Sequence, residues 1–164
     1  MSRTGATGED DGKRPGEVAI DLPERFDAGV YFIGTIRTPW KTREECPKNP
    51  REARGVPCTI EVAEPYRAGL SGLENFTHVV AVYFMDRARR DLVVQVPRHA
   101  GVARGTFALR SPVRPNPIAI SVVRLLKTEG AKLTVAGLDC IDGTPLLDIK
   151  PFIATVDVPG PDAG

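Results

Sequence analysis

Proline and glycine divide this chain into short segments. Its 164 residues include 16 glycines and 15 prolines, a larger share than an average globular domain contains. Both residues interrupt helices, so their frequency disfavours a helical bundle and favours a turn-rich β architecture. The length is sufficient for one domain with a hydrophobic core of its own.

The segments between these breakers have the composition of β-strands. They are rich in β-branched and aromatic residues, or they alternate apolar with polar positions as half-buried strands do. The predicted strands are residues 30–36, 59–62, 78–85, 92–96, 106–109, 118–126 and 132–138. Only residues 67–75 have a helical pattern. Many short strands with little helix predict an all-β fold with one or two short helices, either a closed or partly open barrel or a sandwich.

The ends of the chain differ in composition from its middle. The first residues are small, charged and glycine-rich, and they cannot bury enough apolar area to offset the entropy lost on ordering. We therefore predict a flexible N-terminal tail over residues 1–27, one β-barrel domain over residues 28–157, and a C-terminal tail over residues 158–164.

Several classes of protein do not match the sequence. No apolar run approaches the roughly 18 residues of a membrane span, and the N-terminus lacks the apolar core of a secretory signal. No glycine-rich phosphate-binding motif of the Rossmann or P-loop type is present. The cysteines Cys46, Cys58 and Cys140 have the spacing of neither a disulfide framework nor a zinc site. We expect a cytoplasmic protein without a membrane or metal partner.

The densest group of polar residues is the sequence RSPVRPNP over residues 110–117. Its three prolines stiffen the loop. The guanidinium groups of Arg110 and Arg114 suit carboxylate or phosphate oxygens, and an asparagine such as Asn116 can hydrogen-bond an adenine edge. The alternative is a proline-rich connector with solvated arginines.

A second polar group surrounds Asp139 and Asp142, directly after the predicted strand 132–138. The sequence Asp-Gly-Thr-Pro over residues 142–145 is typical of a turn, and a turn explains Asp142 without any ligand. The alternative is that the two carboxylates accept hydrogen bonds from ribose hydroxyls or bind a cation.

Arginines are concentrated between residues 86 and 114. Seven arginines and two aspartates give this segment a formal charge of +5, in a chain whose net charge is +1. Concentrated positive charge is typical of a surface that binds a phosphate backbone. The alternative is a solvated loop with some arginines in salt bridges. The use of arginine without lysine favours an anionic partner.

Four motifs occur in order across about residues 30–155. They are IGTIRTP at residues 33–39, GLSGLENFTH at 69–78, RSPVRPNP at 110–117 and DCIDGTPLLDIKPF at 139–152. Together they resemble the TsaA-like family, the TrmO type of tRNA methyltransferase. The resemblance implies a β-barrel without a Rossmann domain, S-adenosyl-L-methionine (SAM) as cofactor, and a homodimer. It also implies N6-methylation of threonylcarbamoyladenosine beside the anticodon of threonine tRNA.

The resemblance further implies which residues bind SAM. The expected cofactor-binding residues are Pro47, Lys48, Asn49, Asp86, Arg87, Arg110, Ile120, Asp139, Cys140, Ile141 and Asp142. Arg110 would pair with the methionine carboxylate, and Asp139 or Asp142 would accept from the amino group or a ribose hydroxyl.

The resemblance also gives the polar loop and the arginine segment an RNA-related role. Asn116, between two prolines, is the candidate residue for orienting the substrate in catalysis. The expected tRNA phosphate contacts are Arg87, Arg89, Arg90 and Arg114.

The sequence departs from the family pattern in two respects. Asp86 and Arg87 stand where some members have His-Gln, and we expect no counterpart of the additional C-terminal domain of longer members. Two alternatives therefore stay open: a SAM-dependent methyltransferase of a small molecule, and a non-catalytic β-barrel that binds RNA. The aromatic content of 6% disfavours the second, because proteins that bind single strands stack bases on aromatic side chains.

Overall fold

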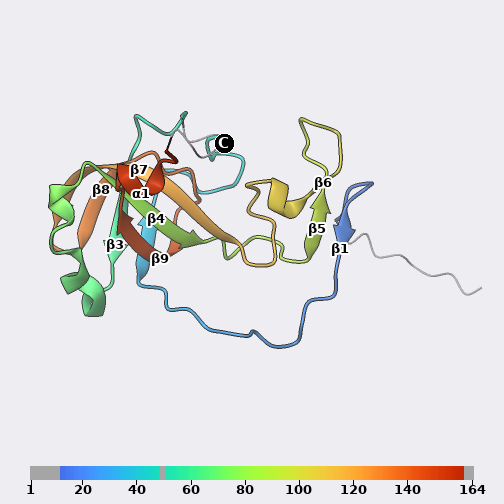
Figure 1. The fold of residues 1–164 in the computed structure, drawn as a ribbon, viewed down its shortest axis with the longest axis horizontal. Coiled ribbons are helices and arrows are strands. Elements are labelled where there is room, and N and C mark those ends of the chain that lie inside the picture. Colours follow the sequence, from blue (N-terminus) through green and yellow to red (C-terminus); the bar gives the residue numbers. More distant parts are fainter. Residues whose placement is uncertain (1–11, 49–50, 161–164) are drawn as a thin grey trace, which may run out of the picture. The chain divides into compact units, whose positions relative to one another are not determined.

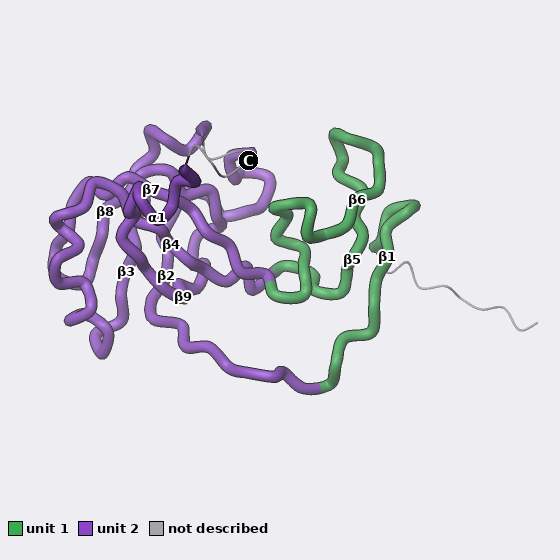
Figure 2. The backbone as a smooth tube through the Cα atoms, viewed as in Figure 1, with its two compact units in different colours: residues 1–24, 88–116 green, residues 25–87, 117–164 purple. Residues whose placement is uncertain are grey.

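The computed structural model describes residues 12–48 and 51–160, and the chain forms two compact units (Figure 2). Unit 1 consists of residues up to 24 together with residues 88–116, and unit 2 consists of residues 25–87 and 117–164. The segment 88–116, which lies in the middle of the predicted domain, thus groups with N-terminal residues. The predicted boundaries at residues 27 and 157 remain predictions.

Unit 2 is built on a closed barrel of antiparallel strands (Figure 1). The order around the barrel is β2-β3-β8-β7-β4-β9, and pairing of β9 with β2 closes it. The strands are β2 (Gly34–Arg37), β3 (Pro57–Val62), β4 (His78–Phe84), β7 (Ile118–Glu129), β8 (Lys132–Ala136) and β9 (Thr144–Pro151). The predicted β-barrel is therefore confirmed.

Side chains point alternately into and out of the barrel along its strands, and the inward-pointing ones fill its interior. On β4, Val79, Ala81 and Tyr83 are buried, and the residues between them are more exposed. On β7, Ser121 and Val123 are buried in the same way. Each fully buried aliphatic side chain contributes roughly 1.5–3 kcal/mol to stability. Because β4 and β7 are neighbours, two polar side chains, Tyr83 and Ser121, meet inside this mostly apolar core.

Unit 1 contains a small sheet with the order β1-β5-β6. Its strands are β1 (Val18–Ala19), β5 (Leu92–Gln95) and β6 (Arg104–Gly105), followed by the 3₁₀ turn η3 (Thr106–Ala108). Strand β1 lies within the segment predicted to be a tail. The Glu17 carboxylate there accepts a 3.1 Å hydrogen bond from the Val96 backbone, and this contact fixes the start of β1 against β5.

Three predicted elements differ from the structure. The strand predicted over 30–36 begins only at Gly34, since the preceding aromatic residues are exposed instead of paired. The strand predicted over 106–109 is replaced by η3, because the Thr106 hydroxyl donates to the Leu92 carbonyl and the backbone turns. The helix predicted over 67–75 is split into η1 (Glu64–Leu70) and η2 (Leu73–Asn75) by Gly72, whose φ is 90°.

The C-terminal part of the barrel is longer than the sequence pattern predicts. Strand β9 contains two prolines, which ordinarily argue against a central strand. It nevertheless pairs with both β2 and β4, and a short helix α1 (Ala154–Asp157) follows. Among the described residues, no helix has the length and apolar character needed to cross a membrane.

Candidate functional site

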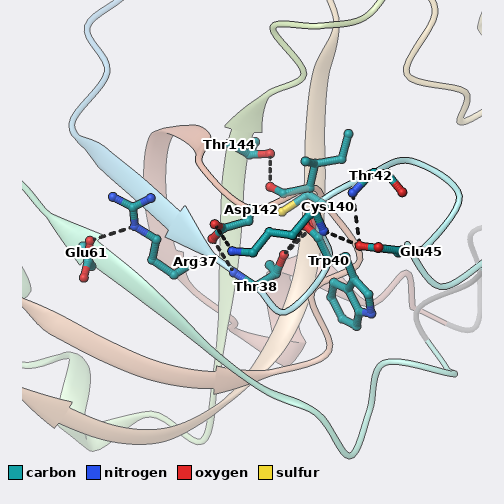
Figure 3. A network of polar contacts seen from close by, with 11 residues as sticks. Arg37, Thr38, Trp40, Thr42, Glu45, Glu61, Cys140, Asp142 and Thr144 are labelled. Carbon is teal, nitrogen blue, oxygen red and sulfur yellow. Dashed lines mark hydrogen bonds and ion pairs between the residues drawn. The ribbon is translucent and has the colours of Figure 1, made fainter.

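Two loops of unit 2 are joined by hydrogen bonds at one end of the barrel (Figure 3). One follows β2, and the other precedes β9. The Thr38 hydroxyl donates to the Cys140 carbonyl over 2.9 Å, and the Asp142 amide donates to the Trp40 carbonyl over 2.7 Å. The Thr144 hydroxyl donates to the Ile141 carbonyl over 2.6 Å. The segment 139–142 is therefore held in one conformation by β2 and its loop.

Asp142 connects these loops through both oxygens of its carboxylate. Oδ1 accepts from the Thr38 amide over 3.1 Å, and Oδ2 accepts from Lys41 Nζ over 2.5 Å. The hydrogen bond from Lys41 is the main reason that the pKa of Asp142 lies below its usual value. The Asp142 side chain thus has a structural role in the loop, as the turn interpretation of the sequence proposes.

We expect the Asp142→Asn substitution to lower the free energy of unfolding by about 1 kcal/mol at about pH 7, because the amide cannot form the ion pair with Lys41. Since folding lowers the pKa of Asp142, its contribution is present above the ordinary value of 3.8 and is lost as the pH falls below it. Urea denaturation of both proteins at about pH 7 and about pH 3 measures this. A stability difference of the same size at both pH values would contradict the assignment.

Asp139 faces a polar pair inside the barrel. Tyr83 is 2% exposed, and its hydroxyl donates to Asp139 Oδ1 over 3.2 Å. Burial, followed by the negative charge of Asp139, raises the pKa of Tyr83, so the phenol stays protonated. The Tyr83 hydroxyl has one proton, which it donates to Asp139. The Ser121 hydroxyl, 2.9 Å away, therefore donates to Tyr83. Ser121, Tyr83 and Asp139 thus form a chain of hydrogen bonds that ends on a carboxylate.

Two cysteines, Cys46 and Cys140, lie close to Asp139 in this group of hydrogen-bonded residues, and both are protonated thiols. Cys140 is 1% exposed, and burial raises its pKa to about 12. Burial, followed by the charge of Asp139, also raises the pKa of Cys46. Since the thiolate is the nucleophilic form of cysteine, neither residue is activated for covalent catalysis. Among the residues that the structure describes, no group of three or more potential metal ligands is found.

The other predicted cofactor residues of unit 2 lie on loops and on the outside of the barrel. Pro47 is half-buried, and the Lys48 amide donates to the Glu52 carboxylate over 3.1 Å, whereas Asn49 lies outside the described residues. Asp86 and Arg87 are exposed after β4. Ile120 is 53% exposed on β7, since its neighbour Ser121 occupies the inward position.

Residues 110–116 of the RSPVRPNP loop belong to unit 1, where Arg114 holds them in place. The Arg114 guanidinium donates to the carbonyls of Ser111, at 2.9 Å, and Thr106, at 3.0 Å, and also to that of Leu109. Gln95 adds a 2.6 Å hydrogen bond to the Val113 carbonyl. These contacts give Arg114 a structural role, and a phosphate contact by this residue remains a prediction.

Asn116, the predicted catalytic residue, is oriented by Arg90. Arg90 Nε donates to the Pro115 carbonyl over 2.6 Å, and its Nη2 donates to Asn116 Oδ1 over 3.2 Å. Because arginine can only donate, the Asn116 oxygen faces Arg90 and its NH₂ group is the end available to a ligand. Arg89 forms a two-pronged ion pair with Asp91 at 2.6 and 2.9 Å, and Arg110 is exposed.

The structure therefore brings together only part of the predicted site. Cys140, Ile141 and Asp142 lie in the joined loops, with Asp139 at the Tyr83 hydrogen bond. Arg110 and Asn116 belong to the other unit. Tyr83, Ser121 and Lys41 are not among the predicted site residues, and no local signal marks them, because Tyr83 follows the apolar run of β4 and has the pattern of a core residue.

Comparison with known proteins identifies relatives of this chain. Residues 35–158 match the family model for the tRNA-methyltransferase O N-terminal domain. A probable S-adenosyl-L-methionine-binding protein, VirR, from Rhizobium radiobacter is 46% identical over 84% of this chain and 78% of its own length. A tRNA (adenine(37)-N6)-methyltransferase from Mus musculus is 44% identical over 55% of this chain and 22% of its own length.

A solved structure has the same fold. The crystal structure of TrmO from Pseudomonas aeruginosa superposes with a TM-score of 0.69 and 35% identity, over 85% of this chain. The present chain spans 61% of that protein's length.

Proposed function

This chain belongs to the tRNA-methyltransferase O N-terminal domain family, and we propose that it transfers a methyl group from SAM to N6 of an adenine in tRNA. The specific acceptor that we propose is threonylcarbamoyladenosine beside the anticodon of threonine tRNA. The names of the relatives support SAM as cofactor and tRNA adenine as substrate. The observation that carries the proposal in the structure is the Asp139 carboxylate, fixed by Tyr83 beside the family motif of residues 139–142.

The side chains of Asp139, Arg110 and Ile120 can interact with different groups of SAM. SAM carries a sulfonium, an ammonium group and ribose hydroxyls, all of which a carboxylate such as Asp139 attracts or accepts from. The methionine carboxylate suits the exposed guanidinium of Arg110, and the exposed Ile120 offers an apolar surface. The family resemblance adds Pro47, Lys48, Asp86 and Arg87 to the proposed cofactor contacts.

When bound, SAM would supply an electrophilic methyl group, to which the acceptor nitrogen bonds in line as the bond from the methyl carbon to sulfur breaks and the thioether leaves. The chain's own residues then act by binding and orienting the reactants, which is the main source of acceleration in such a displacement. Asn116 offers its NH₂ group, which suits an acceptor atom on the base edge. Arg90, which we expected to contact phosphate, acts here by fixing Asn116.

The proposal also covers the oligomeric state of the protein, its location in the cell and its contacts with tRNA phosphates. From the resemblance, we propose a homodimer that acts in the cytoplasm. Contacts of Arg87 and Arg89 with tRNA phosphates would make RNA binding dependent on salt. Arg89 would contact phosphate only if its ion pair with Asp91 opens.

Calorimetric titration with SAM, in the presence and absence of bulk tRNA, tests this function. We expect SAM to bind with a one-to-one stoichiometry per chain, and tRNA to strengthen its binding. SAM binding that tRNA leaves unchanged would instead favour a small-molecule acceptor. Absence of SAM binding in both titrations would overturn the methyltransferase proposal and leave an RNA-binding module.

A further inference from the structure

The arginines of residues 88–116 fall into two groups in unit 1. Arg89, Arg90 and Arg114 make the ion pair and carbonyl contacts described above. Arg98, Arg104 and Arg110 are exposed. Arg98 and Arg104 thus place exposed positive charge on the β5–β6 loop and on β6.

A phenylalanine is exposed within the same region. Phe107 is 82% exposed, the highest value among the large apolar side chains in the described part of the chain. It lies in η3, three residues after Arg104. Arg104 lies on β6, directly before this turn, so exposed positive charge and an exposed aromatic ring are three residues apart in the chain.

The backbone that carries Phe107 is held by buried polar contacts. Thr106 is 1% exposed, and its hydroxyl donates to the Leu92 carbonyl and accepts from Gln95 Nε2 over 2.8 Å. On the other side, Arg114 holds the carbonyl of Leu109. These hydrogen bonds fix the backbone on both sides of Phe107, whose ring lies in solvent. A backbone that is already ordered reduces the entropy lost when a partner binds.

We propose that Arg104 and Phe107, together with Arg98 on the β5–β6 loop, form a surface that binds unpaired bases of RNA. Phe107 stacks on a base, and the arginines contact the adjoining phosphates. The combination of an aromatic face with positive charge is the chemistry that recognises single-stranded RNA, whose bases are accessible for stacking. This inference rests on the proposed tRNA substrate and names the part of unit 1 that binds its loop.

The test uses fluorescence anisotropy with a labelled RNA hairpin that has the stem and loop of a tRNA anticodon arm. Phe107→Ala is expected to weaken hairpin binding by about tenfold, the order of one base-stacking contact. Phe107→Leu should behave like the alanine variant, because it keeps an apolar side chain but lacks an aromatic face, and Phe107→Trp should bind like wild type. Thermal unfolding of each variant verifies the fold.

Two controls separate stacking from charge. Phe26→Ala removes a phenylalanine that is 78% exposed in unit 2 and is expected to leave hairpin affinity unchanged. Arg104→Ala should reduce the dependence of log affinity on log salt by about one, whereas Phe107→Ala leaves that slope unchanged. A blunt RNA duplex of the same length should bind wild type and Phe107→Ala equally.

Each contrary result has a distinct meaning. If the wild-type protein binds no hairpin, this surface and the proposed tRNA substrate both fail. If the wild type binds and Phe107→Ala binds equally well, the surface is wrong and the proposed function is unaffected. If Phe107→Ala changes the sedimentation of the protein without changing hairpin affinity, Phe107 lies in a contact between protein chains and the proposal is overturned.

Discussion

Replacing Asp139 by asparagine is expected to weaken SAM binding by about thirtyfold or more, which corresponds to about 2 kcal/mol. The substitution removes the negative charge and keeps an oxygen that can accept the hydrogen bond from Tyr83. The fold should therefore be retained. SAM affinity falls because a cationic or hydroxyl group of SAM loses a charged partner that the protein holds in a fixed position.

A matched control is available on β9. Asp148 is a carboxylate that pairs with Lys150 at 2.6 Å on the barrel surface, and Asp148→Asn is expected to leave SAM affinity unchanged. Isothermal titration of the two variants and the wild type measures the difference. Equal SAM affinity of Asp139→Asn and the wild type would exclude Asp139 from the cofactor site.

The Gly34→Ala substitution is expected to destabilise the barrel by about 3 kcal/mol. A Cβ atom at Gly34 would lie 2.2 Å from the carbonyl oxygen of Glu61 and 3.0 Å from Cα of Val62. Both are backbone atoms of the paired strand β3, so they cannot move aside as a flexible side chain could. Gly34 also pairs with Leu146 of β9, so the clash occurs where β2 joins two strands and closes the barrel.

Urea denaturation measures this effect, with Gly69→Ala as the control. A Cβ atom at Gly69, in the same unit, would meet no atom of another part of the chain within 4 Å, so its substitution should change the free energy of unfolding by less than about 1 kcal/mol. Equal stability of the Gly34 and Gly69 variants would show that β2 and β3 separate enough to admit a methyl group.

The all-β class could be predicted from local patterns and the barrel from the family resemblance, whereas the hydrogen bonds of Ser121, Tyr83 and Asp139 inside the barrel could not. Alternation of apolar residues identifies β3, a nearly continuous apolar run identifies β4, and the turn residues 128–130 identify the β7–β8 hairpin, since each pattern is contained in a few consecutive residues. Tyr83 on β4 and Asp139 in the loop between β8 and β9 are 56 positions apart, and only the tertiary fold brings them into contact. Tyr83 also lies in an apolar run, where a tyrosine has the pattern of an ordinary core residue.

The roles of the arginines could not be separated by sequence for a related reason. Arg114 and Arg104 have the same charge and similar neighbours, so composition assigns both to an anionic partner. In the folded protein, Arg114 donates hydrogen bonds to carbonyls of its own loop, whereas Arg104 is exposed.

Strand β9 could not be predicted from its local sequence. Its prolines favour a turn, and it forms a strand because it pairs with β2 and β4.

The measurement that tests the central claim most directly is mass spectrometry of nucleosides from threonine tRNA incubated with the protein and SAM. The proposal predicts N6-methylated threonylcarbamoyladenosine with the wild-type protein and a strongly reduced amount with Asp139→Asn. If this tRNA gains no methyl group, although SAM binds and the tRNA carries the threonylcarbamoyl modification, the assignment of this chain as a methyltransferase of that nucleoside is contradicted.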